Sequence, residues 1–301
     1  MQQLPVIPEA EFIERQQKIR ALLKANNLDL FVAYADDRAV FGPAYARWLF
    51  NYATHFEPCC ILIPAEGEAV IVTGPESEQL IYASSYCRNV EVIREFTHPD
   101  EEYPYARVTD LASVVRRLRQ DADIRTAGVV GKETMPHNLA LALEAIFGPG
   151  NLIDVERQVI QLRAVKSEHE IRVIEHAYAI AEQGLQAAIR SVAEGRTERE
   201  VAAEAEYAMR RMGSEGMGID TIVASGVERT YPIIARTSHR RIRQGDLVLL
   251  TMAPRYEGYH GAIGMPVVMG RPEPAVRAAM EAAIEAQQAA RETLRPGTPG
   301  H

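Results

Sequence analysis

Two histidines and a threonine in the second half of the chain have side chains that can take part in catalysis. His260 lies on a predicted strand and can act as a general base or acid near neutral pH. His239 lies in the loop that precedes this region, and Thr251 carries a hydroxyl that can orient a substrate. Each also has a structural interpretation: a hydrogen bond at a strand end, a loop surface, and the strand preference of β-branched residues. Catalytic roles for these three residues are therefore hypotheses.

Three further side chains are candidates for substrate binding. Arg229 and Arg236 flank the same loop and can bind a substrate carboxylate as a fork-like pair, although a plain surface role accounts for each equally well. Tyr259 is the third candidate, one residue before His260. The sequence contains no glycine-rich nucleotide motif, no zinc-protease His-Glu-x-x-His and no Gly-x-Ser-x-Gly nucleophile motif.

The elements that position these residues follow two different patterns. Up to about residue 156, strand and helix signals alternate, which predicts an α/β domain over residues 1–156. It begins with a helix over 9–25 and a strand over 28–34, followed by a hairpin of residues 59–63 and 69–73. Later segments are helices over 76–86, 111–118 and 138–147 and strands over 90–95, 127–131 and 152–155.

Residues 157–301 form a second predicted domain, which begins with two helices. Ser167 with Glu170, and Thr197 with Glu200, have the spacing of capping boxes, in which each side chain bonds the other residue's backbone amide. The first of these helices is predicted to bury one apolar face, made up of Ile171, Ile174, Tyr178, Ala181, Leu185, Ile189 and Val192. Strands and a last helix over 274–294 follow.

Composition bounds the class of protein. The 301 residues are 47% hydrophobic and 25% charged, as in ordinary globular domains, and the net charge of −8 gives a nucleic-acid partner no support. No run approaches membrane-spanning length and no signal peptide is evident. The 3 cysteines lack metal-type spacing, which fits a reducing compartment, so we expect a cytoplasmic protein without membrane or nucleic-acid partners.

The stretch from Ile219 to Gly270 resembles the first half of the "pita-bread" domain of aminopeptidase P, prolidase, methionine aminopeptidase and creatinase. The matching residues are Val223-Ala224-Ser225-Gly226, Gly245-Asp246-Leu247-Val248, Tyr256, Gly258-Tyr259 and Gly270. The resemblance covers essentially the whole chain. It implies a ribonuclease-H-like creatinase-type N-terminal domain, then the pita-bread domain, and a homodimer.

Metal ligands of the related metallopeptidases are replaced in this sequence. The family's His and two Asp correspond to the segment Pro232-Ile233-Ile234, to Thr251 and to Ala262. Divalent cations in such sites need carboxylate and imidazole ligands, which isoleucine and alanine cannot supply. Creatinase also lacks the two Asp and works without metal, but it retains the His and has a substrate-binding Glu where Gly264 stands here. Because strand side chains alternate, His260 is expected to share a face with residue 262, near the expected pocket.

Only the first half of the pita-bread domain is expected here, because Arg295-Pro296-Gly297-Thr298 resembles the start of the second half. An incomplete sequence, a separate chain that supplies the rest, and a broken relative all fit.

Three functions remain open. The leading hypothesis is a creatinase-like, metal-independent hydrolase of a C–N bond in a small amide, an amidine or a dipeptide-like substrate. The second is an Xaa-Pro metallopeptidase that would use Mn or Zn. The third is a non-catalytic binding module, as in pita-bread domains that have lost activity.

Overall fold

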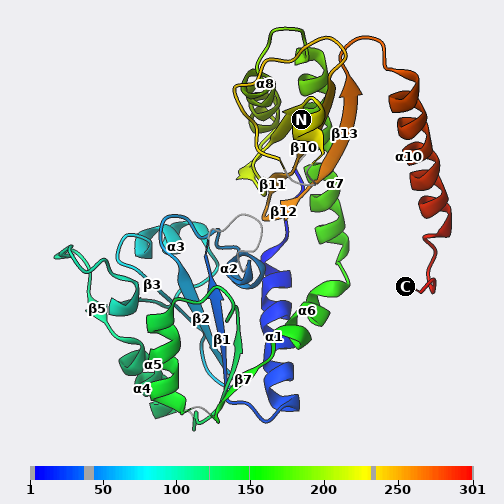
Figure 1. Cartoon of the computed structure of the whole chain (residues 1–301). Helices are drawn as coiled ribbons and strands as arrows, with labels where there is room; N and C mark the ends of the chain where they lie inside the picture. Colours follow the sequence, from blue (N-terminus) through cyan, green and yellow to red (C-terminus); the bar gives the residue numbers. More distant parts are fainter. Residues whose placement is uncertain (1–3, 37–43, 122, 149, 232–234, 300–301) are drawn as a thin grey trace. The chain divides into compact units, whose positions relative to one another are not determined.

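The computed structural model describes residues 4–36, 44–121, 123–148, 150–231 and 235–299. Contacts between α-carbons divide the chain into two compact units (Figure 1). Unit 1 runs up to His176 and includes Arg255–His260, and unit 2 holds Ala177–Pro254 and the residues from Gly261 onward. The replaced segment at 232–234 lies outside the described residues.

Unit 1 is built on one mixed sheet. Its described strands are β1 (Leu30–Ala35), β2 (Cys59–Pro64), β3 (Val70–Thr73), β4 (Val90–Ile93), β5 (Val108–Thr109), β6 (Ala127–Val130) and β7 (Leu152–Asp154). The strand order is β5-β4-β3-β2-β1-β6-β7. The pairs β1–β2 and β2–β3 are antiparallel, and the other pairs are parallel.

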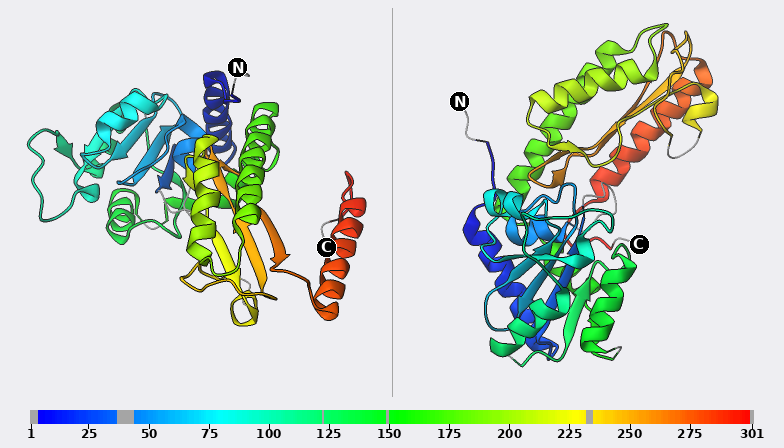
Figure 2. Two further views of the ribbon diagram at one scale, coloured as in Figure 1. Left: turned by 90° about the horizontal axis from the view of Figure 1, so that it is seen from above. Right: turned by 90° about the vertical axis from the view of Figure 1, so that its left-hand side faces the viewer.

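Helices cover both faces of this sheet (Figures 1 and 2). They are α1 (Glu9–Ala25), α2 (Tyr45–Phe50), α3 (Glu78–Ser84), a 3-10 turn (Arg94–Phe96), α4 (Leu111–Asp121), α5 (His137–Phe147) and α6 (Glu156–Ala164). Because side chains alternate along a strand, Phe31 and Ala33 of β1 pack with α1 and α2, whereas Leu30 and Val32 pack with α4 and α5. The predicted α/β fold of this part of the chain is thereby confirmed, and the predicted helices and strands begin and end within three residues of the observed ones.

The turn between β11 (Pro254–Tyr256) and β12 (Tyr259–His260) needs a left-handed backbone. Glu257 has φ 48° and Gly258 has φ 78°, which suits a two-residue hairpin turn. A Cβ at Gly258 would lie 2.4 Å from Cγ of Arg47, whose guanidinium pairs with Glu257 at 2.9 Å. The glycine therefore serves both the turn and the close packing of Arg47.

Helix α7 (Glu168–Ser191) begins with the predicted capping box. The Ser167 amide donates to Glu170 Oε2 at 2.7 Å, and the Glu170 amide donates to Ser167 Oγ at 3.1 Å. The predicted apolar face is wrong at Ile171 and Tyr178, which are exposed, and right at Ala181 and Leu185. The buried stripe instead follows Val173, Ala177, Ile180, Gly184 and Ala188, where small residues allow close approach.

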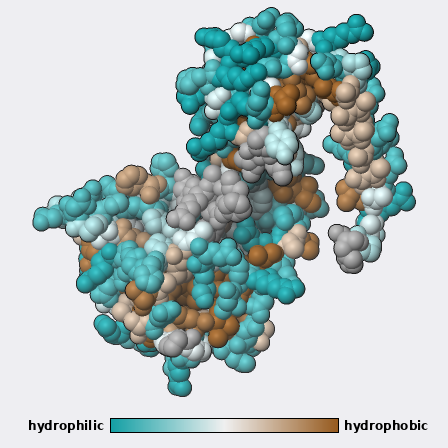
Figure 3. Space-filling view, in the orientation of Figure 1, coloured by the Kyte–Doolittle hydropathy of each residue, from teal (hydrophilic) through white to brown (hydrophobic). Residues whose placement is uncertain are grey.

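Unit 2 contains the part of α7 from Ala177 onward, the whole of α8 (Glu198–Arg211) and a small sheet. The other elements here are β8 (Gly216–Met217), β9 (Ile222–Ser225), α9 (Val227–Thr230), β10 (Leu247–Met252), β13 (Ile263–Val268) and α10 (Pro274–Thr293). β9, β10 and β13 form an antiparallel sheet in the order β13-β10-β9. Helix α10 buries none of its residues, and apolar surface is visible over the β10–β13 region in Figure 3.

Candidate functional site

Thr251 lies on the less buried face of the small sheet. In β10, Val248, Leu250 and Met252 are buried, so the alternate residues, including Thr251, point to the opposite side. The cross-strand neighbours of Thr251 are Gly264 on β13 and Ile222 on β9. This hydroxyl therefore has a residue without a side chain on one side and an aliphatic side chain on the other.

The side chains at these positions do not fit a two-metal centre. Thr251 offers one neutral hydroxyl, and Ala262, which is exposed, offers a methyl group. Nowhere in the described ranges do three or more His, Cys, Asp or Glu side chains gather in a way that could hold a metal ion. Hard divalent cations bind through several oxygen or imidazole ligands, so these residues do not provide the ligand set of a related metallopeptidase.

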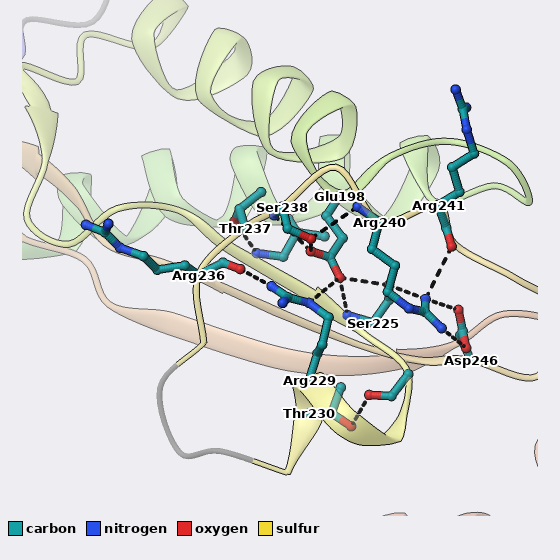
Figure 4. Close-up of polar contacts among 12 residues, drawn as sticks. Glu198, Ser225, Arg229, Thr230, Arg236, Thr237, Ser238, Arg240, Arg241 and Asp246 are labelled. Carbon is teal, nitrogen blue, oxygen red and sulfur yellow. Dashed lines mark hydrogen bonds and ion pairs between the residues drawn. The ribbon is translucent and has the colours of Figure 1, made fainter.

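The buried carboxylate of Glu198, on the first turn of α8, accepts five hydrogen bonds (Figure 4). Its Oε1 accepts from the Ser225 amide at 2.7 Å, the Ser225 hydroxyl at 2.9 Å and Arg229 Nε at 3.1 Å. Its Oε2 accepts from the Ser238 amide at 2.9 Å and the Ser238 hydroxyl at 2.6 Å. One side chain thus ties the end of β9 to the segment that leads toward β10.

These hydrogen bonds keep Glu198 ionised. Burial raises the pKa of a carboxyl group, but the hydrogen bonds from Ser238 and Ser225 outweigh it and hold the pKa of Glu198 below its usual value. A carboxylate with this many donors is stable in a dry environment, because its oxygen lone pairs are occupied.

A second ion pair extends this network. Arg240 donates from both terminal nitrogens to Asp246, at 2.5 and 3.0 Å, and its Nη1 also donates to the Ser225 hydroxyl at 2.7 Å. Burial raises the pKa of Asp246, but the hydrogen bonds from Arg240 and from the Arg243 amide lower it by more. The pKa of Asp246 is therefore below its usual value. The pair fixes the turn into β10, next to Gly226, where a Cβ would lie 2.5 Å from Arg240 Nη2.

The two arginines predicted to bind a substrate carboxylate differ in environment. Arg229 is occupied by Glu198 and by the carbonyl oxygen of Arg236, to which its Nη2 donates. The Arg236 side chain is 92% exposed and lies 3.7 Å from Asp220. They are linked through this backbone carbonyl. Their role as a carboxylate-binding pair stays a prediction.

The argument that placed His260 beside residue 262 is not supported by the strand boundaries. β12 ends at His260 and β13 begins at Ile263, so no continuous strand carries both residues. Gly261 lies between the two strands, and a Cβ there would lie 2.3 Å from the carbonyl oxygen of Ala177. His260 is exposed in unit 1, and its catalytic role stays a prediction.

Tyr259 and His239 are also placed by the structure. The Tyr259 hydroxyl donates to Glu170 Oε1 at 2.5 Å, and burial together with Glu170 raises its pKa well above the usual value despite the opposing effect of Arg15. His239 is exposed in the segment between Ser238 and Arg240. Ser238 and Arg240 both belong to the Glu198 network, whereas the hydrogen bonds of that network among the described residues do not include the His239 ring.

Sequence reasoning missed Glu198. It identified the neighbouring capping box, in which the Thr197 amide donates to Glu200 Oε2 at 2.6 Å and the Glu200 amide donates to Thr197 Oγ1 at 3.2 Å. A signal was available, because Glu198 shares the buried helix face of Val201, Ala202 and Ala205. An acidic residue on an apolar helix face requires buried hydrogen-bond partners.

Comparisons with known families match both parts of the chain. The Creatinase/Prolidase N-terminal domain profile matches residues 15–165, and the profile of Metallopeptidase family M24 matches residues 172–301. The Xaa-Pro dipeptidase of Pyrococcus horikoshii is 30% identical over 234 residues, which are 78% of this chain and 63% of that protein. The Xaa-Pro dipeptidase of Pyrococcus furiosus matches to the same extent.

Solved structures agree with this assignment. The prolidase from Pyrococcus horikoshii superposes with a TM-score of 0.76 at 27% identity, over 94% of this chain and 73% of that one. The X-Pro aminopeptidase from Thermotoga maritima gives a TM-score of 0.75 at 26% identity, over 91% and 70%. The chain spans 63% of the length of the Pyrococcus dipeptidases. No helix in the described ranges is long and apolar enough to cross a membrane.

Proposed function

The chain belongs to the creatinase–prolidase family of pita-bread proteins, and on this basis we propose that the protein hydrolyses a C–N bond without a bound divalent metal. The substrate class is a small amide, an amidine or a dipeptide-like molecule. The observation that carries the proposal is the replacement of two expected carboxylate ligands by Thr251 and Ala262 within a retained scaffold.

Hydrolysis without a Lewis acid needs a group that removes a proton from water and donors that orient the substrate. The candidates for the proton acceptor are His260, in unit 1, and His239, in unit 2, and the Thr251 hydroxyl is the candidate for orienting the scissile group. Arg229, Arg236 and Tyr259 are the candidates for holding a substrate carboxylate or carbonyl. We further propose a homodimer in the cytoplasm, to be checked by light scattering and by fractionation.

The deciding experiment measures metal content and activity on the same preparation of the full-length gene product. Metal would be quantified by plasma mass spectrometry after growth with added Mn, Co or Zn, and product formation from a panel of small amides, amidines and dipeptides would be followed by mass spectrometry. We expect turnover that a chelator leaves unchanged. Stoichiometric metal, with activity abolished by chelation and restored by the ion, would overturn the proposal.

The second candidate is an Xaa-Pro metallopeptidase. It is favoured by the 30% identity to a Pyrococcus protein named Xaa-Pro dipeptidase. It requires ligands other than the side chains of Thr251 and Ala262. Metal-stimulated release of proline from a Gly-Pro dipeptide would establish it. Absence of any turnover, with retained folding, would leave the non-catalytic binding module.

A further inference from the structure

A pocket of about 280 Å3 opens in unit 1 beside the start of α7. It is lined by Ile160, Arg163, Ala164, Lys166, Glu170 and Tyr259. These residues come from α6, from the connection between α6 and α7, from the first turn of α7 and from β12, and all of them belong to the same compact unit. Of these residues, Tyr259 is also a candidate for substrate binding in the proposed function.

Among the described residues that line this pocket, the carboxylate is that of Glu170, and it is both hydrogen-bonded and ion-paired. Glu170 is 6% exposed, and its Oε1 accepts from the Tyr259 hydroxyl at 2.5 Å and lies 3.2 Å from Arg15 Nη2. Its Oε2 accepts from the Ser167 amide at 2.7 Å. Arg15 is itself buried and is fixed by Glu11 at 2.6 Å and by the Trp48 carbonyl at 3.0 Å. Glu170 is therefore held in place by these contacts, and it shares the positive charge of Arg15 with Glu11.

The two cations that line the pocket have no such partner. Among the described residues, neither Arg163 nor Lys166 forms an ion pair with a carboxylate. The Arg163 guanidinium lies over the rings of Tyr45 and Trp48, at 5.5 and 5.7 Å from their centroids. Lys166 Nζ donates to the carbonyls of Arg163 and Ala164 at 2.8 and 3.2 Å.

Ring contacts fix the plane of a guanidinium while leaving N–H donors at its edge. Together with Lys166, this gives the pocket two positive charges that have no ion-pair partner among the described residues, next to the carboxylate of Glu170, which shares Arg15 with Glu11. We propose that this pocket binds the carboxylate group of a small monocarboxylic acid, such as an N-acylated amino acid. The planar fork of Arg163 suits a carboxylate, and the adjacent Glu170 disfavours a second negative charge on the ligand.

The chain has a built-in reporter for this site. Trp48 is the single tryptophan of the sequence. Its side chain is buried, and the Arg163 guanidinium lies over its ring. Fluorescence of the 301-residue chain would be titrated with N-acetylglycine at constant ionic strength, with calorimetry on the same samples. The neutral N-acetylglycinamide and inorganic phosphate serve as comparison ligands. We expect saturable binding of N-acetylglycine, no binding of the amide, and weaker binding of phosphate.

Variants separate this site from general charge effects. Arg163→Gln and Lys166→Gln should each raise the Kd for N-acetylglycine about tenfold, as expected for the loss of one charge-assisted hydrogen bond. Arg163→Lys, which keeps the charge but loses the fork, should lie in between. Arg157→Gln is the matched control, since Arg157 is exposed on the same helix and does not line the pocket.

Circular dichroism would confirm that each variant is folded before its affinity is compared. The proposal is wrong if neither fluorescence nor calorimetry shows saturable binding to the wild type. It is equally wrong if the neutral amide or phosphate binds as tightly, or if Arg163→Gln retains the wild-type Kd. Because the readout is binding in unit 1, it is independent of whether the protein proves to be a hydrolase.

Discussion

Glu198 accepts two hydrogen bonds from Ser225, one from the backbone amide at 2.7 Å and one from the hydroxyl at 2.9 Å. The first residue comes from the start of α8 and the second ends β9. Both side chains are 0% exposed, so this contact joins helix and sheet in a region that water does not reach. The segment that follows Ser225 leads to Arg229, which also donates to Glu198 at 3.1 Å.

Replacing Glu198 should destabilise unit 2. In Glu198→Gln the amide nitrogen would face donors, so at least one buried N–H or O–H loses its acceptor. We expect a loss of about 2–3 kcal/mol in the free energy of unfolding. Urea unfolding followed by circular dichroism would measure it, with exposed Glu204→Gln on the same helix as the control. Equal stability of the two variants would contradict the assigned role.

The same carboxylate makes stability depend on pH. The pKa of Glu198 is lowered in the folded state, so between the folded and unfolded values the unfolded chain binds more protons. Its contribution is fully present above the ordinary glutamate pKa of 4.5, which applies to the unfolded chain, and is lost as the pH falls through the folded pKa. Asp246 acts in the same direction. The free energy of unfolding, measured from pH 6 downward, should fall less steeply in Glu198→Gln than in the wild type.

Gly261 and Gly264 form a matched pair. A Cβ at Gly261 would lie 2.3 Å from the Ala177 carbonyl oxygen, whereas at Gly264 the nearest atom is Thr251 Oγ1 at 3.3 Å. Backbone cannot move aside as a side chain can, so Gly261→Ala should cost about 2 kcal/mol or more. Gly264→Ala should remain within about 0.5 kcal/mol of the wild type. Thermal and urea unfolding of both variants would measure these losses. A larger loss of stability in Gly264→Ala than in Gly261→Ala would contradict the close packing at Gly261.

Arg229 and Arg236 should separate structure from binding. Arg229→Gln removes a donor from Glu198 and should cost roughly 1 kcal/mol of stability. Arg236→Gln should change stability by less than about 0.5 kcal/mol, because the side chain is 92% exposed. If the two bind a substrate carboxylate, both variants should also raise KM for a carboxylate substrate with little change for its amide. KM values that respond equally for the acid and the amide would disprove that binding role.

Local sequence patterns were enough to predict most elements. The capping boxes predicted at Ser167 and Thr197 are both present in the structure. A capping box involves only residues three positions apart, so a local pattern is enough to predict it. The strand pair of Cys59–Pro64 and Val70–Thr73 also followed from an apolar run, a turn and a second apolar run. The replacement of metal ligands at Thr251 and Ala262 was visible in the sequence, because it is a question of residue type.

Only the tertiary structure decided which side chains meet. The buried face of α7 contains Ala177 and Gly184, whose small size lets other parts of the chain pack closely against the helix. Periodicity alone predicted a face that included the exposed Ile171 and Tyr178. The close approach of Gly261 to the backbone of Ala177, far away in sequence, leaves no room for a side chain between His260 and β13. The same holds for Glu198 with Ser225 and Ser238, and for the pocket between Arg163 and Tyr259. Such contacts join residues distant along the chain, and no local pattern encodes the distance between them.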